Sequence, residues 1–290
     1  MTSSGNRQGA AFMVAAMAAF AVEDALFKTA TQTIPVALAL LIFGGVGLAL
    51  FATLAHLRGD GVAPRGGFTR GLAIRSAFEV TGRLFFGLSL AFGDLSTTSA
   101  ILQATPLVVV LGAVVVFGET VGWRRWTAIL LGLVGVLMVL QPTGASLQPT
   151  AVFALLGMLG FAGRDLATRA APPKVTNAQL GTLGFAMLVV AGLVLQAVTG
   201  TPLAVPPAAD LLRLTTAAVF GVLAYSALTA AMRSGEVSVV TPFRYTRLVF
   251  ALILAVTLFG ERPDTLMLAG SALIVASGLF TLSRARRRPA

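Results

Sequence analysis

The chain has 290 residues, of which 57% are hydrophobic and only 11% are charged, with 21 Lys and Arg against 11 Asp and Glu and a net charge of +10. Soluble domains carry roughly 25% charged residues, so this composition predicts a protein embedded in a membrane. The absence of cysteine excludes disulfides, thiolate metal sites and cysteine nucleophiles, and a single histidine leaves almost nothing for a histidine metal site or a Ser-His-Asp triad.

A helix needs about 20 apolar residues to cross the hydrocarbon core of a bilayer, and short Gly-, Pro- and Arg-containing turns cut the chain into pieces of about that length. We therefore expect an all-α integral membrane protein with ten transmembrane helices. The first piece follows Arg7 as a signal peptide would, but it continues past Glu23 and Asp24, so we interpret it as a retained helix. The expected ranges are 9–29, 34–56, 71–92, 95–117, 124–140, 150–170, 178–198, 209–232, 237–259 and 264–283.

The basic residues of the connectors predict the orientation. With both termini in the cytoplasm, only Lys28, Arg213 and Arg262 of the connectors face the opposite side. An excess of Lys and Arg on the cytoplasmic side is the usual topology signal, so we expect a multi-pass protein of a bacterial-type inner (plasma) membrane with both termini cytoplasmic. The net charge is then explained without a nucleic-acid partner, and we expect none.

The chain contains an internal repeat. GDLSTTSAIL…VFGE (93–119) aligns with GEVSVVTPFR…LFGE (235–261) under a constant shift of 142 residues (235 minus 93). Five spans per half is an odd number, so the second half is expected to enter the membrane from the opposite side. We predict two inverted-topology five-helix repeats, residues 1–142 and residues 143–290, the second with a basic cytoplasmic tail. Inverted repeats are a recurring feature of secondary transporters.

Each half of the repeat ends with an acidic residue, Glu119 or Glu261, where one apolar helix stops and the next begins. Because a helix start favours an anion, both are expected to cap or pair near the start of the following helix rather than to bind substrate.

Charged residues remain inside the expected spans. An Arg or Asp at the centre of a membrane helix costs roughly 2.5–3.5 kcal/mol, so each must be paired or face water. In RSAFEVTGR (75–83), Arg75, Glu79 and Arg83 fall on one face of a helix. Glu79 is expected to bond Arg83 or to reach an Arg of the ninth span, whereas Arg75 lies close enough to the helix end to extend toward the membrane surface.

Local pairs are expected for two further acids, Asp24 with Lys28 and Asp165 with Arg169, each four residues apart. Arg164 and Asp165 are adjacent in sequence, so we expect them to point in different directions and to find different partners.

We predict that the charged stripe faces the interior of the helix bundle. A closed buried network and a solvated substrate cavity both fit that placement, and the two can overlap. Pro106, with Gln103, interrupts the fourth span and Pro242 interrupts the ninth, which suits bending or gating helices. The candidate substrate-binding residues are Phe78, Glu79, Arg83, Gln103, Phe161, Arg164, Asp165, Tyr225, Arg244 and Tyr245.

Ten spans in two halves, each half closing on Phe-Gly-Glu before a Gly-rich helix such as LLGLVGVLMVL (130–140) or LAGSALIVASGLF (268–280), resemble the drug/metabolite transporter superfamily, EamA type. Within it the chain is similar to the amino-acid and metabolite exporters, including the YddG-like aromatic amino-acid exporters. The resemblance implies a central cavity bounded mainly by the third, fourth, eighth and ninth spans. Many relatives carry an Arg in the second span, whereas ALLIFGGVGLAL (39–50) has none.

These observations predict a secondary transporter, an exporter of amino acids or similar small metabolites, that works by alternating access and is not an enzyme. A cavity with both signs of charge and aromatic walls suits a zwitterion. Glu79 and Asp165 are the candidates for binding an amino group or a coupled proton; facilitated diffusion is the alternative to coupling. The expected partners are this substrate and membrane lipids, with no cofactor and no metal. The alternatives are a transporter of nucleotide-like metabolites or cationic drugs, and a non-transporting membrane scaffold or enzyme subunit.

Overall fold

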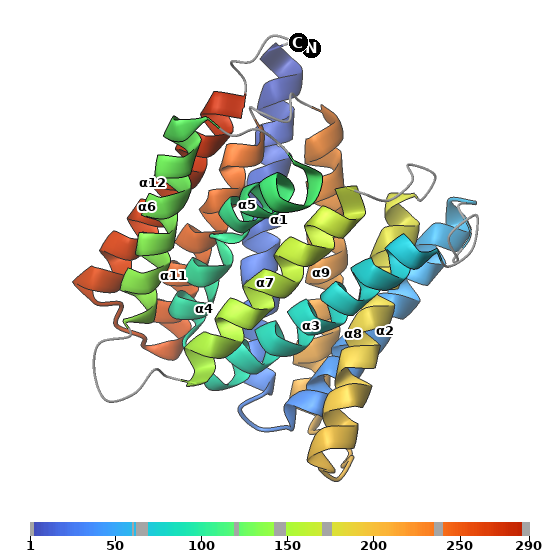
Figure 1. Cartoon of the computed structure of the whole chain (residues 1–290). Helices are drawn as coiled ribbons and strands as arrows, with labels where there is room; N and C mark the ends of the chain where they lie inside the picture. Colours follow the sequence, from blue (N-terminus) through green and yellow to red (C-terminus); the bar gives the residue numbers. More distant parts are fainter. Residues whose placement is uncertain are drawn as a thin grey trace.

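The computed structural model describes residues 3–59, 61, 69–118, 122–141, 149–169, 176–234 and 240–285. All regular secondary structure in these ranges is helical (Figure 1). In chain order the helices are α1 (Ser3–Ala30), α2 (Val36–Leu57), α3 (Arg70–Phe92), α4 (Leu95–Leu102), α5 (Thr105–Phe117), α6 (Trp123–Leu140), α7 (Pro149–Arg169), α8 (Asn177–Thr199), α9 (Ala208–Ser234), the 3-10 helix η1 (Thr241–Tyr245), α11 (Thr246–Phe259) and α12 (Thr265–Ala285).

Seven stretches among the described residues are long and apolar enough to cross a membrane, and α4 and α5 together form one of them, Leu95–Phe117. The apolar stretches of α6 and α12 are shorter, Trp126–Leu140 and Thr265–Phe280. Helix α3 has the length of a span, but charged side chains interrupt its apolar sequence. The prediction of an all-α membrane protein is thus confirmed at the level of helix content and apolar length.

Local sequence explains where several helices begin and end. The side chain of Thr69 accepts a hydrogen bond from the amide of Leu72 at the start of α3, and Thr176 and Gln179 form a reciprocal capping box at the start of α8. At the other end, α5 and α11 stop at Gly118 (φ 65°) and Gly260 (φ 63°). Glycine adopts this left-handed conformation without a steric penalty, so the Gly of each Phe-Gly-Glu triplet terminates a helix.

The helices pack in matching sets. Helix α1 packs along α9 and α3 along α7, while α2 packs on α8 and α6 on α12. When the first five apolar segments are matched in order with the last five, α1 corresponds to α7 and α3 corresponds to α9. Exchanging corresponding helices converts the α1–α9 pair into the α7–α3 pair, and it leaves the α2–α8 and α6–α12 pairs unchanged. Every one of these contacts therefore joins one half of the chain to the other.

Small residues allow two of these pairs to approach closely. A Cβ added to Gly160 of α7 would lie 2.4 Å from the backbone nitrogen of Gly82 in α3, and one added to Gly135 of α6 would lie 2.8 Å from the carbonyl oxygen of Gly270 in α12. Such contacts between backbones are the usual way in which helices associate where no hydrophobic driving force acts between them.

Glu261 joins the two halves through a helix cap. Its carboxylate accepts hydrogen bonds from the amides of Leu95 (2.7 Å) and Ser96 (3.0 Å) and from the Ser96 hydroxyl (2.6 Å), at the start of α4. A capping role was expected, but at the following helix; that helix, α12, is capped by Asp264, which accepts from the Met267 amide at 2.7 Å. Glu119 lies outside the described residues.

Asp94 occupies the N-cap position of α4 but makes no side-chain cap bond there. Burial and the neighbouring Glu261 carboxylate raise the pKa of Asp94. The cap of α4 is therefore supplied from the second half of the chain rather than by the adjacent acid.

Candidate functional site

A cluster of charges surrounds Glu79 on α3, whose residue is only 1% exposed. Its Oε2 lies 3.3 Å from the terminal guanidinium nitrogen NH2 of Arg75, and its Oε1 lies 3.1 Å from Nε of Arg83. Arg164 approaches the same Oε1 at 3.4 Å from α7. One carboxylate thus binds three guanidinium groups, and because it is almost fully buried it is not accessible to a further ligand.

One expectation for this cluster is confirmed and one is wrong. Glu79 bonds Arg83 locally, as expected, and its further partner outside α3 lies on α7. Arg75 does not extend to the membrane surface: it is 5% exposed, and its Nε donates to Thr168 Oγ1 (3.0 Å) of α7. This error arises because α7 packs along α3.

The neighbours Arg164 and Asp165 bind each other, contrary to expectation. Nε and NH2 of Arg164 donate to Asp165 Oδ1 at 3.0 and 2.8 Å. The long Arg side chain folds back toward its neighbour while its other nitrogen reaches Glu79. The side chain of Asp165 is 34% exposed, so part of this carboxylate is open to a ligand. The side chain of Arg169, its expected partner, is outside the described set.

A second buried ion pair joins the two halves. Asp24 of α1 accepts a 2.6 Å hydrogen bond from Arg247 of α11. The local pair with Lys28 was the wrong prediction: Lys28 donates instead to the carbonyls of Leu90 and Gly93 and lies 3.9 Å from Glu261. Tertiary partners outcompete the local one, because each of these charges lies beside a group of another helix that would otherwise be unpaired.

Aromatic rings line the arginines. The ring of Phe161 lies 4.9 Å from the guanidinium carbon of Arg164 and 5.7 Å from that of Arg83, while Arg247 lies 5.7 Å from the ring of Phe86. Cations over ring faces gain most where water is excluded. Tyr225 of α9 belongs to the same region, because the charges of the Glu79 cluster act on its hydroxyl group.

Arg244 differs from the other buried arginines. It lies in η1, and its backbone oxygen accepts a hydrogen bond from Gln103 Nε2 (3.3 Å), so the interrupted segments of the two halves touch. Among the described residues its guanidinium makes no ion pair, and the acid that acts on it is Asp165. This cation and this partly exposed carboxylate therefore interact electrostatically without forming an ion pair.

The remaining candidates are placed as follows. Pro106 is the second residue of α5, directly after the break at Gln103 and Ala104, and Pro242 is the second residue of η1. Phe78 is 41% exposed and its ring packs on Gly163 of α7. Tyr245 is not brought to the charged cluster, since its hydroxyl lies over Gly278 of α12.

The sequence reasoning left Glu23 out of the candidate site. Glu23 of α1 is 6% exposed and lines a cavity of about 20 Å³ together with Asp24 and Arg83. The available signal was its position in an apolar span, where an acid without an obvious partner is unusual. No group of three or more His, Asp or Glu side chains converges as a metal site would require among the described residues.

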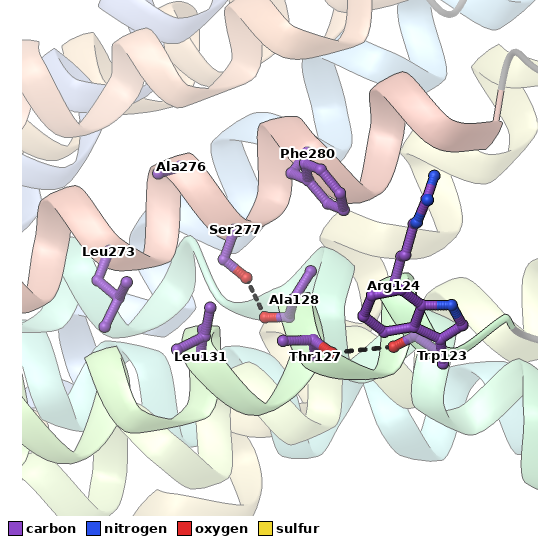
Figure 2. A pocket seen from close by; sticks show the side chains of 9 residues that line it. All are labelled: Trp123, Arg124, Thr127, Ala128, Leu131, Leu273, Ala276, Ser277 and Phe280. Atoms are coloured by element: carbon purple, nitrogen blue, oxygen red, sulfur yellow. Dashed lines mark hydrogen bonds between the residues drawn. The ribbon is translucent and has the colours of Figure 1, made fainter.

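A larger hollow, of about 420 Å³, lies between α6 and α12, away from these charges (Figure 2). It is lined mainly by apolar side chains such as Leu131, Leu273 and Phe280, with Trp123 and Arg124 at one end. Because it lacks paired charges of both signs among its described lining residues, we do not take it as the candidate site.

The arrangement defines a class: a helical membrane protein whose two halves enclose a network of buried charges. The EamA-like transporter family matches the chain twice, over residues 7–141 and 148–283. The chain therefore belongs to the EamA-like transporter family, with the family's domain repeated twice, which confirms the resemblance noted from the sequence. It is a small-molecule transporter and not an enzyme.

Relatives with named substrates are similar over most or all of the chain. An S-adenosylmethionine uptake transporter of Rickettsia bellii is 26% identical over 69% of both chains. A riboflavin transporter of Rhizobium johnstonii is 26% identical over 97% of this chain and 92% of its own. The pseudopaline exporter CntI of Pseudomonas aeruginosa is 26% identical over 97% and 98%. A crystal structure with 17% identity superposes with a TM-score of 0.63 over 99% of this chain and 100% of the other, which shows a shared fold.

Proposed function

We propose that the protein exports amino acids or closely similar small metabolites across the inner membrane by alternating access between two inverted five-helix repeats, residues 1–142 and 143–290. The two family matches, which meet near residue 142, support the division. The exchange of packing partners described above supports the relation between the halves. The start of α1 and the end of α12 lie at the same end of the bundle (Figure 1), as an even number of spans requires.

The substrate class is inferred from two groups that interact electrostatically without forming an ion pair: the guanidinium of Arg244, which has no ion-pair partner among the described residues, and the partly exposed carboxylate of Asp165. A zwitterion offers a carboxylate to the first and an ammonium group to the second. Arg bonds a carboxylate through two parallel N–H groups, which gives both affinity and orientation. Glu79 then serves as a fixed counter-ion that positions Arg83 and Arg164, rather than as a substrate ligand.

The charge balance argues against cationic drugs. Five buried or half-buried arginines, Arg75, Arg83, Arg164, Arg244 and Arg247, stand against the four acids Glu23, Asp24, Glu79 and Asp165. An excess of positive charge suits an anion or a zwitterion, so nucleotide-like metabolites are the second candidate. Relatives are named for uptake as well as for export, and export is the direction that we propose for this chain.

The test is uptake of labelled amino acids into liposomes that contain the purified protein, compared with nucleotides and a cationic dye. Removing a hydrogen-bonded charge costs about 1.5–3 kcal/mol, so Arg244→Ala should lower amino-acid flux about ten- to hundredfold, with Arg244→Lys in between. Arg262→Ala, an exposed change near the start of α12, is the matched control. Flux of nucleotides alone would favour the second candidate, flux of no solute would favour a scaffold, and undiminished flux in Arg244→Ala would show that the site is wrong.

Membrane orientation can be tested with single cysteines, because the natural chain has none. With both termini cytoplasmic, His56→Cys should be labelled by an impermeant thiol reagent only from the cytoplasmic side, and Thr201→Cys only from the opposite side. Labelling of both from the same side would contradict the proposed topology.

A further inference from the structure

The first helix carries two adjacent acids in different situations. Asp24 is bonded to Arg247 at 2.6 Å. Glu23 is 6% exposed, and its Oε2 has no hydrogen-bond partner among the described residues. A buried carboxyl group without a partner is unusual in a protein interior and more so at a membrane-embedded position, where it marks a functional site by default.

The Glu23 carboxyl lines a cavity rather than packed protein. The cavity, of about 20 Å³, is just large enough for one water molecule. Apart from Glu23, Asp24 and Arg83, the side chains around it are apolar, including the rings of Phe27, Phe43 and Phe86. A single water beside an isolated carboxyl group in apolar surroundings is a suitable donor and acceptor for one proton.

The charged groups facing Glu23 come from three helices. Asp24 lies on α1, Arg83 on α3 and Arg247 on α11, and Asp24 and Arg83 also line the same cavity. From α9 it meets the backbone of Gly221, where an added Cβ would lie 3.0 Å from Oε2. Helix α4 contributes no titratable residue, and Arg244 of η1 is not among the charged groups that act on Glu23. The second titratable group of η1, the Tyr245 hydroxyl, lies over Gly278.

Both nearby arginines are already bonded to other acids. Arg83 lies 3.1 Å from Glu79, and Arg247 is bonded to Asp24. In this arrangement the uncharged form of Glu23 is the one that its surroundings tolerate. A movement of α3 or α11 that releases either arginine would give the ionised form a partner, so the charge of Glu23 is linked to the arrangement of the helices.

We propose that the Glu23 carboxyl is the proton-exchange site of this transporter: when Arg83 or Arg247 changes partner, its O–H bond breaks and the proton passes, through a water molecule that enters the cavity, to the aqueous phase, and uptake of a proton by the same route restores the acid. This proposal rests on the transport function proposed above and identifies the proton as its coupling ion. Glu79 and Asp165, the acids predicted from the sequence, are less suited, because Glu79 binds three arginines and Asp165 is bonded to Arg164.

Two measurements on the full chain test the proposal. Infrared difference spectra recorded during a pH titration in liposomes without substrate report protonated carboxyl groups directly, and Glu23→Gln should remove one titrating band that the control Asp264→Asn retains. Accumulation of labelled amino acid under a pH gradient is the second readout. With one proton per substrate, a gradient of about one pH unit supports an accumulation of about tenfold; Glu23→Gln should reduce this to the level without a gradient while still binding the labelled substrate.

Glutamine mimics the uncharged acid in size and shape, so the variant is expected to fold. A carboxyl band that persists in Glu23→Gln, or accumulation that still follows the pH gradient, would overturn the proposal. If the wild type moves no amino acid, the proposed function fails, and the infrared titration alone decides the role of Glu23.

Discussion

Glu261 of the second half caps α4 of the first half, and replacing it tests whether this contact holds the two halves together. Three donors converge on its carboxylate, the amides of Leu95 and Ser96 and the hydroxyl of Ser96, at 2.7, 3.0 and 2.6 Å. Glu261→Ala removes all three acceptor contacts and leaves two partly buried amides at the start of a helix. A hydrogen bond to a charged group contributes about 1.5–3 kcal/mol, and loss of a cap costs about 0.5–2 kcal/mol.

Because water can reach part of this site and replace some of the lost bonds, we expect a net loss of about 3 kcal/mol, less than the sum of three full bonds. The shift is about 2–4 °C per kcal/mol for domains of 150–250 residues and smaller for longer chains, so for these 290 residues we expect the melting temperature to fall by about 6 °C. Ser96→Ala removes only the hydroxyl contact and should cost about 1 kcal/mol. The double variant should cost less than the sum of the two single variants, since both delete the same contact.

The assay is thermal unfolding of the purified protein in nanodiscs, with Arg262→Ala as the control. Arg262 is the next residue and is exposed, so its removal should change stability by less than about 0.5 kcal/mol. If Glu261→Ala melts at the same temperature as this control, the carboxylate does not hold α4, and the argument that a residue of one half fixes a helix of the other is wrong.

Three further predictions concern the packing and the charges. Glu79→Gln leaves one buried and two half-buried guanidinium groups without their shared partner and should cost about 3–5 kcal/mol in the same assay, part of which Arg75→Gln should restore. Gly160→Ala places a methyl group 2.4 Å from the backbone of α3 and should cost about 1–3 kcal/mol, whereas Gly45→Ala, with nothing within 4 Å, should be neutral or stabilising. Hydrogen bonds from a Gln side chain and a backbone amide lower the pKa of Asp264 below its ordinary value, so its stabilising effect, measured against Asp264→Ala, should be present above about pH 4 and shrink as the pH falls further.

The sequence was sufficient to predict the helices but not the contacts between them. Apolar length and turn residues are local properties, so the expected ranges agree with the observed helices to within a few residues at most ends. The interruption of the fourth span was also visible, because Pro106 cannot continue a helix; the structure places the break just before it.

Partners far apart in sequence could not be predicted from spacing. Asp24 and Arg247 are 223 residues apart, and Glu79 and Arg164 are 85 apart. The i, i+4 rule ranks only neighbours on the same helix and supplies a few tenths of a kcal/mol, which is less than the cost of leaving a charge of another helix unpaired inside the membrane. For this reason the local pair of Asp24 with Lys28 was predicted and the tertiary pair was formed.

Asp24 is bonded to an arginine, whereas Glu23 Oε2 has no hydrogen-bond partner among the described residues, and this difference affects how the protein could change conformation. Separating Arg247 from Asp24 without a replacement would leave two buried charges unpaired, at a cost of about 3–5 kcal/mol, which would confine the protein to one state. Alternating access requires two states within a few kcal/mol of each other. On the proposed scheme Glu23, one residue from Asp24, offers Arg247 a second carboxylate if it gives up its proton as the arginine arrives. One buried charge, that of Asp24, is then left without a partner instead of two, so the release of the proton lowers the cost of the helix movement and the movement favours the release.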